Sequence, residues 1–127
     1  MSENVNRNRE ILKEWCGVFN TGDWDKIKPA LMELTTKDYL LHDPSVPKGV
    51  QTFAEFAVSF ERDFMNKRDY KITLEDCIGE DDKLASRCMI EWIDPNSNEK
   101  KKVLLIVISR FEGDKVAEEW QVTAPVA

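Results

Sequence analysis

The stretch KKVLLIVISRFEGDKVAEEWQV, residues 101–122, decides the fold because it contains two strands and the turn between them. The pattern predicts strands over Lys101–Phe111 and Lys115–Val122, with a tight turn at Glu112-Gly113-Asp114. A turn this short joins neighbouring strands that run antiparallel. Val103–Ile108 is apolar at every position, which predicts that both faces of the first strand are buried.

Two more strands are predicted immediately before this pair. After Arg68 the apolar residues recur at every second position, which is typical of a half-buried strand. Its alternating apolar residues are Tyr70, Ile72, Leu74 and Ile78. A turn over residues 79–82 leads into a second strand, Lys83–Ile93, and the sequence Asp94–Asn98 then predicts a loop.

The first half of the chain has the spacing of helices. Residues Asn4–Asn20 place their apolar side chains on one broad helical face. A second, shorter helix begins near Trp24, and Pro29 inside it predicts a kink or a late start. Tyr39–His42 predicts a short strand, after which the prolines and the glycine of residues 44–49 predict a loop.

A third helix is predicted from the capping-box spacing of Thr52 and Glu55. Its inner face is strongly aromatic and carries Phe53, Phe56, Phe60 and Phe64. Core packing is the ordinary explanation for such a stripe, and a ligand-binding aromatic surface is the alternative.

Length and composition limit the class of protein. The 127 residues predict a single domain over 1–127, and helices followed by strands indicate the α+β class. No segment approaches the ~20 apolar residues of a membrane span, and the polar N-terminus shows no secretory signal. Three cysteines without a Cys-x-x-Cys pair favour reduced thiols and a cytoplasmic location.

Charge and strand pattern restrict the partners. With 18 Lys and Arg against 24 Asp and Glu, the net charge of −6 argues against nucleic acid or an anionic membrane as the main partner. The helices can cover one face of the sheet, whereas Val103–Ile108 predicts burial on both. We therefore expect a second copy of the chain on the other face, giving a homodimer through the sheet.

Several short motifs together resemble the SnoaL-like polyketide cyclase family. They are Phe19–Trp24, His42-Asp43-Pro44, Gly49 before the aromatic helix, Gly79–Arg87 and Gly113–Trp120. The resemblance covers nearly the whole chain. It implies the nuclear transport factor 2-like, or ketosteroid isomerase-like, fold, in which three helices pack in the concave face of a strongly curved, mainly antiparallel sheet. The resulting cone holds an apolar pocket, and members of the family are often dimers.

The resemblance implies a small-molecule enzyme of the cyclase or isomerase type, acting by acid/base chemistry on an apolar carbonyl compound. It requires no metal and no organic cofactor. Because this fold also hosts modules that do not catalyse, the alternative is a module that binds an apolar ligand or serves dimerisation.

Three ionisable residues are candidates for the chemistry. His42, on the same strand face as Leu40, is either an acid/base at the pocket mouth or a histidine held by Asp43 or backbone. Glu118 has apolar neighbours on its strand face, so burial would raise its pKa toward the range useful for proton transfer. Alternatively, Glu118 pairs with Arg87 or lies on an exposed face. Arg87 either supports an enolate or neutralises Glu118.

Apolar side chains are the candidates for substrate binding. They are Trp120, Trp24, Leu40, Phe56 and Phe60. One position departs from the family pattern: many members carry an aspartate four residues after the terminal-strand tryptophan, and this chain has Ala124 there. Since alanine cannot move a proton, either His42 and Glu118 carry the chemistry or the domain binds without catalysing.

Overall fold

A computed structural model describes residues 3–126 of the chain. In this part of the chain the elements follow in the order α1 (Glu3–Phe19), α2 (Trp24–Leu34), β1 (Thr35–His42), β2 (Val50–Thr52), α3 (Phe53–Phe64), β3 (Arg68–Glu80), β4 (Lys83–Ile93), β5 (Lys100–Glu112) and β6 (Lys115–Pro125). None of these helices is long and apolar enough to cross a lipid bilayer.

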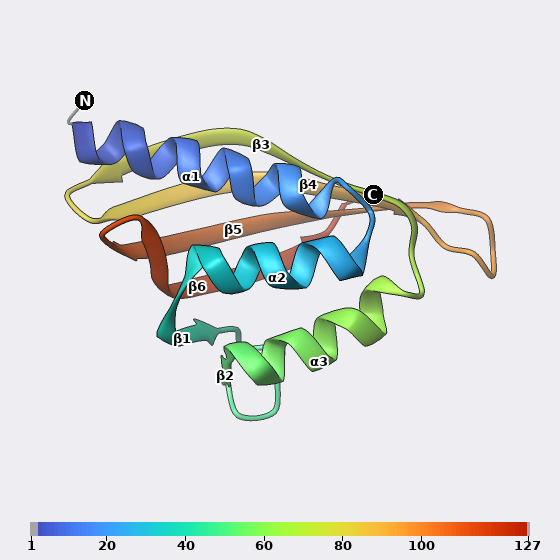
Figure 1. The fold of residues 1–127 in the computed structure, drawn as a ribbon. Helices are drawn as coiled ribbons and strands as arrows, with labels where there is room; N and C mark the ends of the chain where they lie inside the picture. The colour runs from blue at the N-terminus through green and yellow to red at the C-terminus, as the bar shows by residue number, and fades with distance from the viewer. Residues whose placement is uncertain (1–2, 127) are drawn as a thin grey trace.

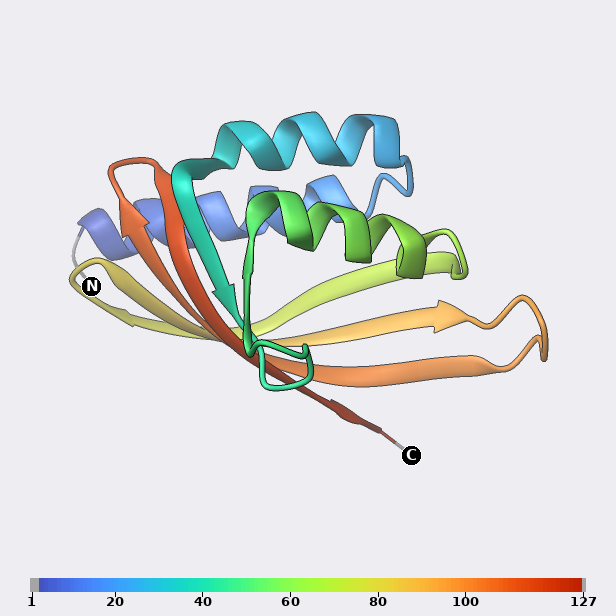
Figure 2. The same ribbon diagram turned by 90° about the horizontal axis from the view of Figure 1, so that it is seen from below.

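The strands form a single curved sheet with the helices on one side of it (Figures 1 and 2). The strand order is β2-β1-β6-β5-β4-β3, and the pairings are antiparallel except for β1 with β6, which is parallel. Figure 2 shows the sheet bending around the helices, so that the helices occupy its concave face. The predicted α+β class and the mainly antiparallel curved sheet are confirmed.

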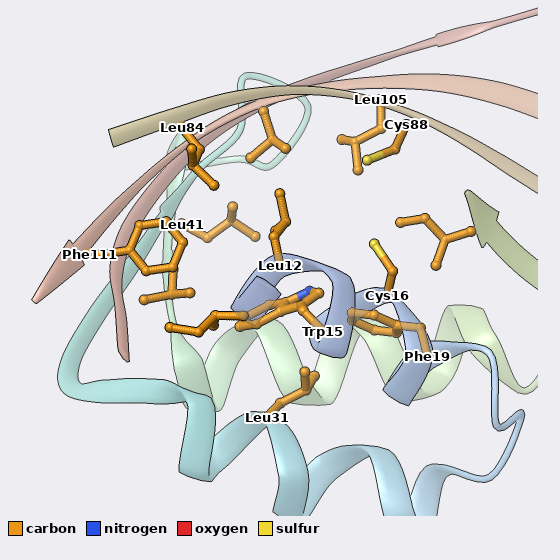
Figure 3. Close-up of a cluster of buried hydrophobic side chains, with 14 of the residues drawn as sticks. Leu12, Trp15, Cys16, Phe19, Leu31, Leu41, Leu84, Cys88, Leu105 and Phe111 are labelled. Carbon is orange, nitrogen blue, oxygen red and sulfur yellow. The ribbon is translucent and has the colours of Figure 1, made fainter. Parts of the chain in front are cut away.

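Helix α1 supplies much of the core between the layers. Leu12, Trp15 and Phe19 lie on its buried face, and Figure 3 shows them among the buried side chains between the helices and the sheet. The end of this helix is fixed to β3 by Asn20, whose side-chain amide donates to the carbonyl of Ile72 at 2.8 Å and accepts from its N–H at 2.7 Å. Both backbone groups of Ile72 are thereby satisfied by a side chain instead of a neighbouring strand.

The region from α2 to β2 differs from the prediction in three details. Helix α2 begins at Trp24, capped by the Asp23 carboxylate, and contains Pro29, so of the two predicted effects of this proline, a kink or a late start, the late start does not occur. Strand β1 begins at Thr35 instead of Tyr39 because β6 offers a parallel partner from that point. The short strand β2, which was not predicted, follows the loop of residues 44–49 and pairs with the end of β1. The two differences in the strands arise from pairing with other segments of the chain, which local spacing does not reveal.

Two register shifts break the expected alternation of the strands. In β3 the shift between Leu74 and Asp76 turns Ile78 away from the core, so this side chain is 69% exposed and its predicted burial is wrong. In β6 the pairing passes from Val116 opposite Phe111 to Glu118 opposite Arg110. Val116 is consequently buried, while Glu118 faces the other side of the sheet. A bulge of this kind changes which face every later residue occupies.

At Gly79, strand β3 lies so close to its neighbours that a larger residue would not fit. A Cβ atom at this position would lie 2.5 Å from Leu84 Cδ2 and 2.9 Å from both the Lys83 carbonyl oxygen and Val5 Cγ1. We expect Gly79→Ala to lower the free energy of unfolding by about 1–3 kcal/mol, because backbone atoms must shift to make room. Urea denaturation followed by circular dichroism measures the change.

Gly17 is the matched control for this substitution. It lies in α1, and a Cβ atom there would meet nothing within 4 Å. Gly17→Ala should therefore stabilise the protein by up to about 1 kcal/mol, since alanine is the better helix former. Equal effects of the two substitutions would contradict the tight packing at Gly79.

Candidate functional site

A cavity of about 110 Å³ lies between the helices and the concave face of the sheet. Its walls are mostly aromatic and aliphatic, and they include Trp15, Phe19, Phe56, Phe60, Leu105 and Val107. Of the residues expected to bind substrate, Phe56 and Phe60 line the cavity. Trp24 packs against Phe60 with ring centroids 5.5 Å apart and is not part of the lining.

Glu119 of β6 places a carboxyl group in the wall of this apolar cavity. The residue is only 5% exposed. The Tyr39 hydroxyl donates to Oε1 at 2.7 Å, and the Ser109 hydroxyl donates to Oε2 at 2.6 Å. Burial raises the pKa of Glu119 above its ordinary value, and the two hydrogen bonds only partly offset that effect. The cavity therefore contains a fixed carboxyl group that stays protonated to a higher pH than an ordinary glutamate.

Two other polar side chains in the cavity wall extend the site along the sheet. Gln121, two residues beyond Glu119, lines the cavity, and its amide nitrogen donates to Asp43 Oδ2 at 2.9 Å. Burial would raise the pKa of Asp43, but hydrogen bonds from Gln121 and Ser45 outweigh it and lower that pKa. The Asp43 carboxylate thus holds the amide of Gln121 in one orientation. Tyr70 also lines the cavity, and burial raises the pKa of its hydroxyl, which stays protonated.

His42 and Glu118 meet on the convex face of the sheet, outside the cavity. His42 Nε2 lies 2.6 Å from Glu118 Oε2, and Arg110 Nη2 lies 3.3 Å from Glu118 Oε1. The His42 ring also stacks on Trp120, with centroids 5.2 Å apart and planes 5° apart. The hydrogen bond with His42 and the charge of Arg110 lower the pKa of Glu118, so the expected increase is wrong.

The contact predicted as an alternative, between Glu118 and Arg87, does not form. Arg87 pairs with Glu75, with Nε to Oε1 at 3.4 Å, and not with Glu118. The structure thus brings His42 and Glu118 together but leaves Arg87 on another part of the sheet. Leu40 precedes His42 on β1 and is 36% exposed, and it does not line the cavity.

Ala124, the position where many family members carry an aspartate, is also outside the lining of the cavity. Ala124 is exposed, whereas the preceding residue, Thr123, lines the cavity. In this structure the carboxyl group of the cavity comes from Glu119 instead.

Strand alternation did not identify Glu119, because the bulge in β6 turns its side chain to the other face of the sheet. One feature of the sequence does indicate a buried polar partner on this strand. Ser109 is the first polar residue after the apolar run of β5, and it lies at the same strand parity as the buried Leu105 and Val107. A serine at a buried position needs a hydrogen-bonding partner, which the opposite strand must supply.

The fold and the cavity together define the class of this protein. A curved, mainly antiparallel sheet that encloses an apolar cavity against three helices is the architecture of the nuclear transport factor 2-like, or ketosteroid isomerase-like, proteins. Residues 9–126 match the family model of the SnoaL-like polyketide cyclases. The chain belongs to this family.

Solved structures of low sequence identity share the fold. AclR of Streptomyces galilaeus, named as a proposed hydroxylase, aligns with a TM-score of 0.80 at 16% identity over 94% of this chain and 79% of its own. IdmH of Streptomyces antibioticus, named as a proposed polyketide cyclase, aligns with a TM-score of 0.78 at 17% identity over 91% of both chains. No curated protein is similar enough in sequence to count as a relative.

Proposed function

We propose that the protein is a small-molecule enzyme of the cyclase or isomerase type, which moves a proton next to the carbonyl group of an apolar compound. Glu119 is the proton carrier. The observation that carries this proposal is a buried carboxyl group with a raised pKa, held by two hydroxyl groups in the wall of a mostly apolar cavity. A carboxyl group in such surroundings has a pKa closer to neutral pH, where it exchanges protons most effectively.

The chemistry assigns a role to each polar group in the cavity. As a carboxylate, Glu119 removes a proton from the carbon beside the carbonyl, and as an acid it returns the proton to another position. The substrate oxygen gains charge during this transfer and needs a hydrogen-bond donor. Tyr70 and the remaining N–H of Gln121 are two donors in the cavity wall. The Asp43 carboxylate restricts the amide of Gln121 in advance, which reduces the cost of ordering it on binding.

The size of the cavity limits the substrate. A cavity of about 110 Å³ is smaller than the ~300–1,000 Å³ of most ligand pockets and comparable with cavities that admit one benzene ring. A small cyclic ketone is therefore the substrate class that fits without movement of the helices.

A non-catalytic binding module is the second candidate. It is favoured by the small volume of the cavity and by Ala124 at the position where many family members carry an aspartate. Such a module would take up the same apolar compounds and release them unchanged.

Proton exchange at carbon distinguishes the two candidates without knowledge of the natural substrate. The protein is incubated in D₂O with saturated cyclic ketones such as cyclohexanone, and ¹H NMR follows the loss of the signal beside the carbonyl. We expect deuterium to enter at that carbon at least tenfold faster than in buffer alone. Ketones that raise the melting temperature but take up no deuterium would support the binding module and contradict the enzyme.

We also infer that the convex face of the sheet joins two copies of the chain. Ile106, Ile108, Trp120 and Val122 are partly exposed there, side by side on β5 and β6. Monomers seldom leave so many large apolar side chains together in contact with water. Arg110 pairs with both Glu112 and Glu118 and offsets one of their two negative charges. Two such faces can therefore meet with less repulsion than the overall charge of −6 would suggest.

A further inference from the structure

Two thiol groups from different elements meet in the wall of the cavity. Cys16 of α1 and Cys88 of β4 both line it, and both are buried and free of disulfides. Figure 3 shows their sulfur atoms turned toward one another between the helix and the sheet. The proton-transfer function proposed above uses neither of them.

We propose that Cys16 and Cys88 form a thiol site in which Cys16 captures α,β-unsaturated carbonyl compounds that enter the cavity. Thiols add readily to the β-carbon of such compounds, and the apolar cavity selects small molecules of this class. This inference goes beyond the proposed function and does not rest on it, because the capture needs no proton transfer by Glu119.

The arrangement of the two thiols favours Cys16 as the nucleophile. Both sulfur atoms lie in the cavity wall and face one another (Figure 3), and the neighbouring Cys88 thiol lowers the pKa of Cys16, an effect that outweighs the opposing effects of burial and of the Glu119 charge. The neighbouring Cys16 and burial raise the pKa of Cys88, so this residue remains a protonated thiol. The reactive form of a cysteine is the thiolate, which the pair therefore assigns to Cys16.

The addition is balanced without any further reactant. The Cys16 sulfur forms a bond to the β-carbon while the carbon–carbon π bond of the ligand breaks. The proton lost by the Cys16 thiol ends on the α-carbon, and the carbonyl group is regenerated. No oxidant or reductant is consumed, and the product is a thioether between the protein and the ligand.

Cys77 is an internal control within the same chain. It is partly exposed on β3 and does not line the cavity, and its sulfur accepts a hydrogen bond from the Ser86 hydroxyl at 3.7 Å. Simple accessibility would favour reaction at Cys77, whereas the cavity site favours reaction at Cys16.

The test is labelling of the native protein with cyclohex-2-enone, followed by intact-mass and peptide mass spectrometry. We expect one adduct, on Cys16, forming at least tenfold faster than any adduct on Cys77. Excess cyclohexanone, which fills the cavity but has no conjugated double bond for a thiol to add to, should slow it. Cys16→Ser should remove the adduct, Cys88→Ser should slow it severalfold, and Cys77→Ser should leave its rate unchanged.

The wild-type peptide map keeps the test valid even if a cavity variant folds poorly. The proposal would be overturned if Cys77 were labelled before Cys16. It would also be overturned if Cys16 were labelled only after unfolding in urea. Failure here is separable from failure of the enzyme, since a protein that takes the adduct but exchanges no α-proton retains the thiol site and loses the proposed function.

Discussion

Glu119→Gln should reduce the rate of α-proton exchange by about 10²–10⁴-fold, the range expected when a general acid/base is removed. Glutamine keeps the shape of the side chain and can still bond to the Tyr39 and Ser109 hydroxyls, so the fold should persist. What it cannot do is accept and return a proton. Deuterium incorporation into a cyclic ketone, measured by ¹H NMR for both proteins at equal concentration, checks this result.

Glu118→Gln is the matched control, because it makes the same chemical change one residue away on the opposite face of the sheet. Glu118 bonds to His42 and Arg110 outside the cavity, so this substitution should leave the exchange rate within about twofold. If Glu118→Gln abolished exchange and Glu119→Gln did not, the proton carrier would be on the convex face and our assignment would be wrong.

The pH dependence of stability gives an independent readout of Glu119. Its pKa is raised above the ordinary value of 4.5, so between the two pKa values the folded state holds a proton that the unfolded state has lost. The free energy of unfolding should therefore fall as the pH rises through that window, by about 1.4 kcal/mol for each unit of difference between the two pKa values. Above the window it should be level. Glu119→Gln removes this loss, so its stability relative to the wild type should increase with pH.

Ile108→Glu should convert the proposed dimer into a monomer. Ile108 is 42% exposed at the centre of the apolar part of the convex face, beside Trp120 on the neighbouring strand. In a symmetric dimer the substitution buries two new carboxylates without partners, which should weaken association by at least about a hundredfold. Light scattering at micromolar concentration should change from twice 14.7 kDa to 14.7 kDa.

Val58→Glu is the control for this result. Val58 is 70% exposed on α3, on the helical side of the molecule, so a charge there should leave the mass of the dimer unchanged. A wild-type protein that is monomeric at micromolar concentration would refute the dimer directly, and the partly exposed isoleucines of β5 would then face water.

Much of the fold could be predicted from local patterns. The boundaries of β4 were predicted to the residue, Lys83–Ile93, because polar turns flank a clear strand pattern. The capping box of Thr52 and Glu55 opens α3 as expected, with both of its hydrogen bonds present. Strand β2 could not be predicted, since three residues form a strand only because the end of β1 pairs with them.

The candidate site could be predicted only in part. Phe56 and Phe60 were identified correctly as cavity residues because helical spacing fixes which side chains share a face. His42 and Glu118 were expected to serve the pocket, yet they lie on the convex face, with Glu118 bonded to His42 and Arg110.

Apart from β2, the sequence by itself determined the types and the order of the helices and strands, and it placed two adjacent glutamates on the last strand. Only the tertiary structure decided which glutamate faces the cavity. A regular ladder from the Glu112–Lys115 pair would place Ser109 opposite Glu118, whereas the bulge places it opposite Glu119. Successive side chains of a strand point to opposite faces, so a single extra residue exchanges the positions of the two carboxyl groups. That extra residue is set by how β6 packs against both of its neighbours, which no local pattern encodes.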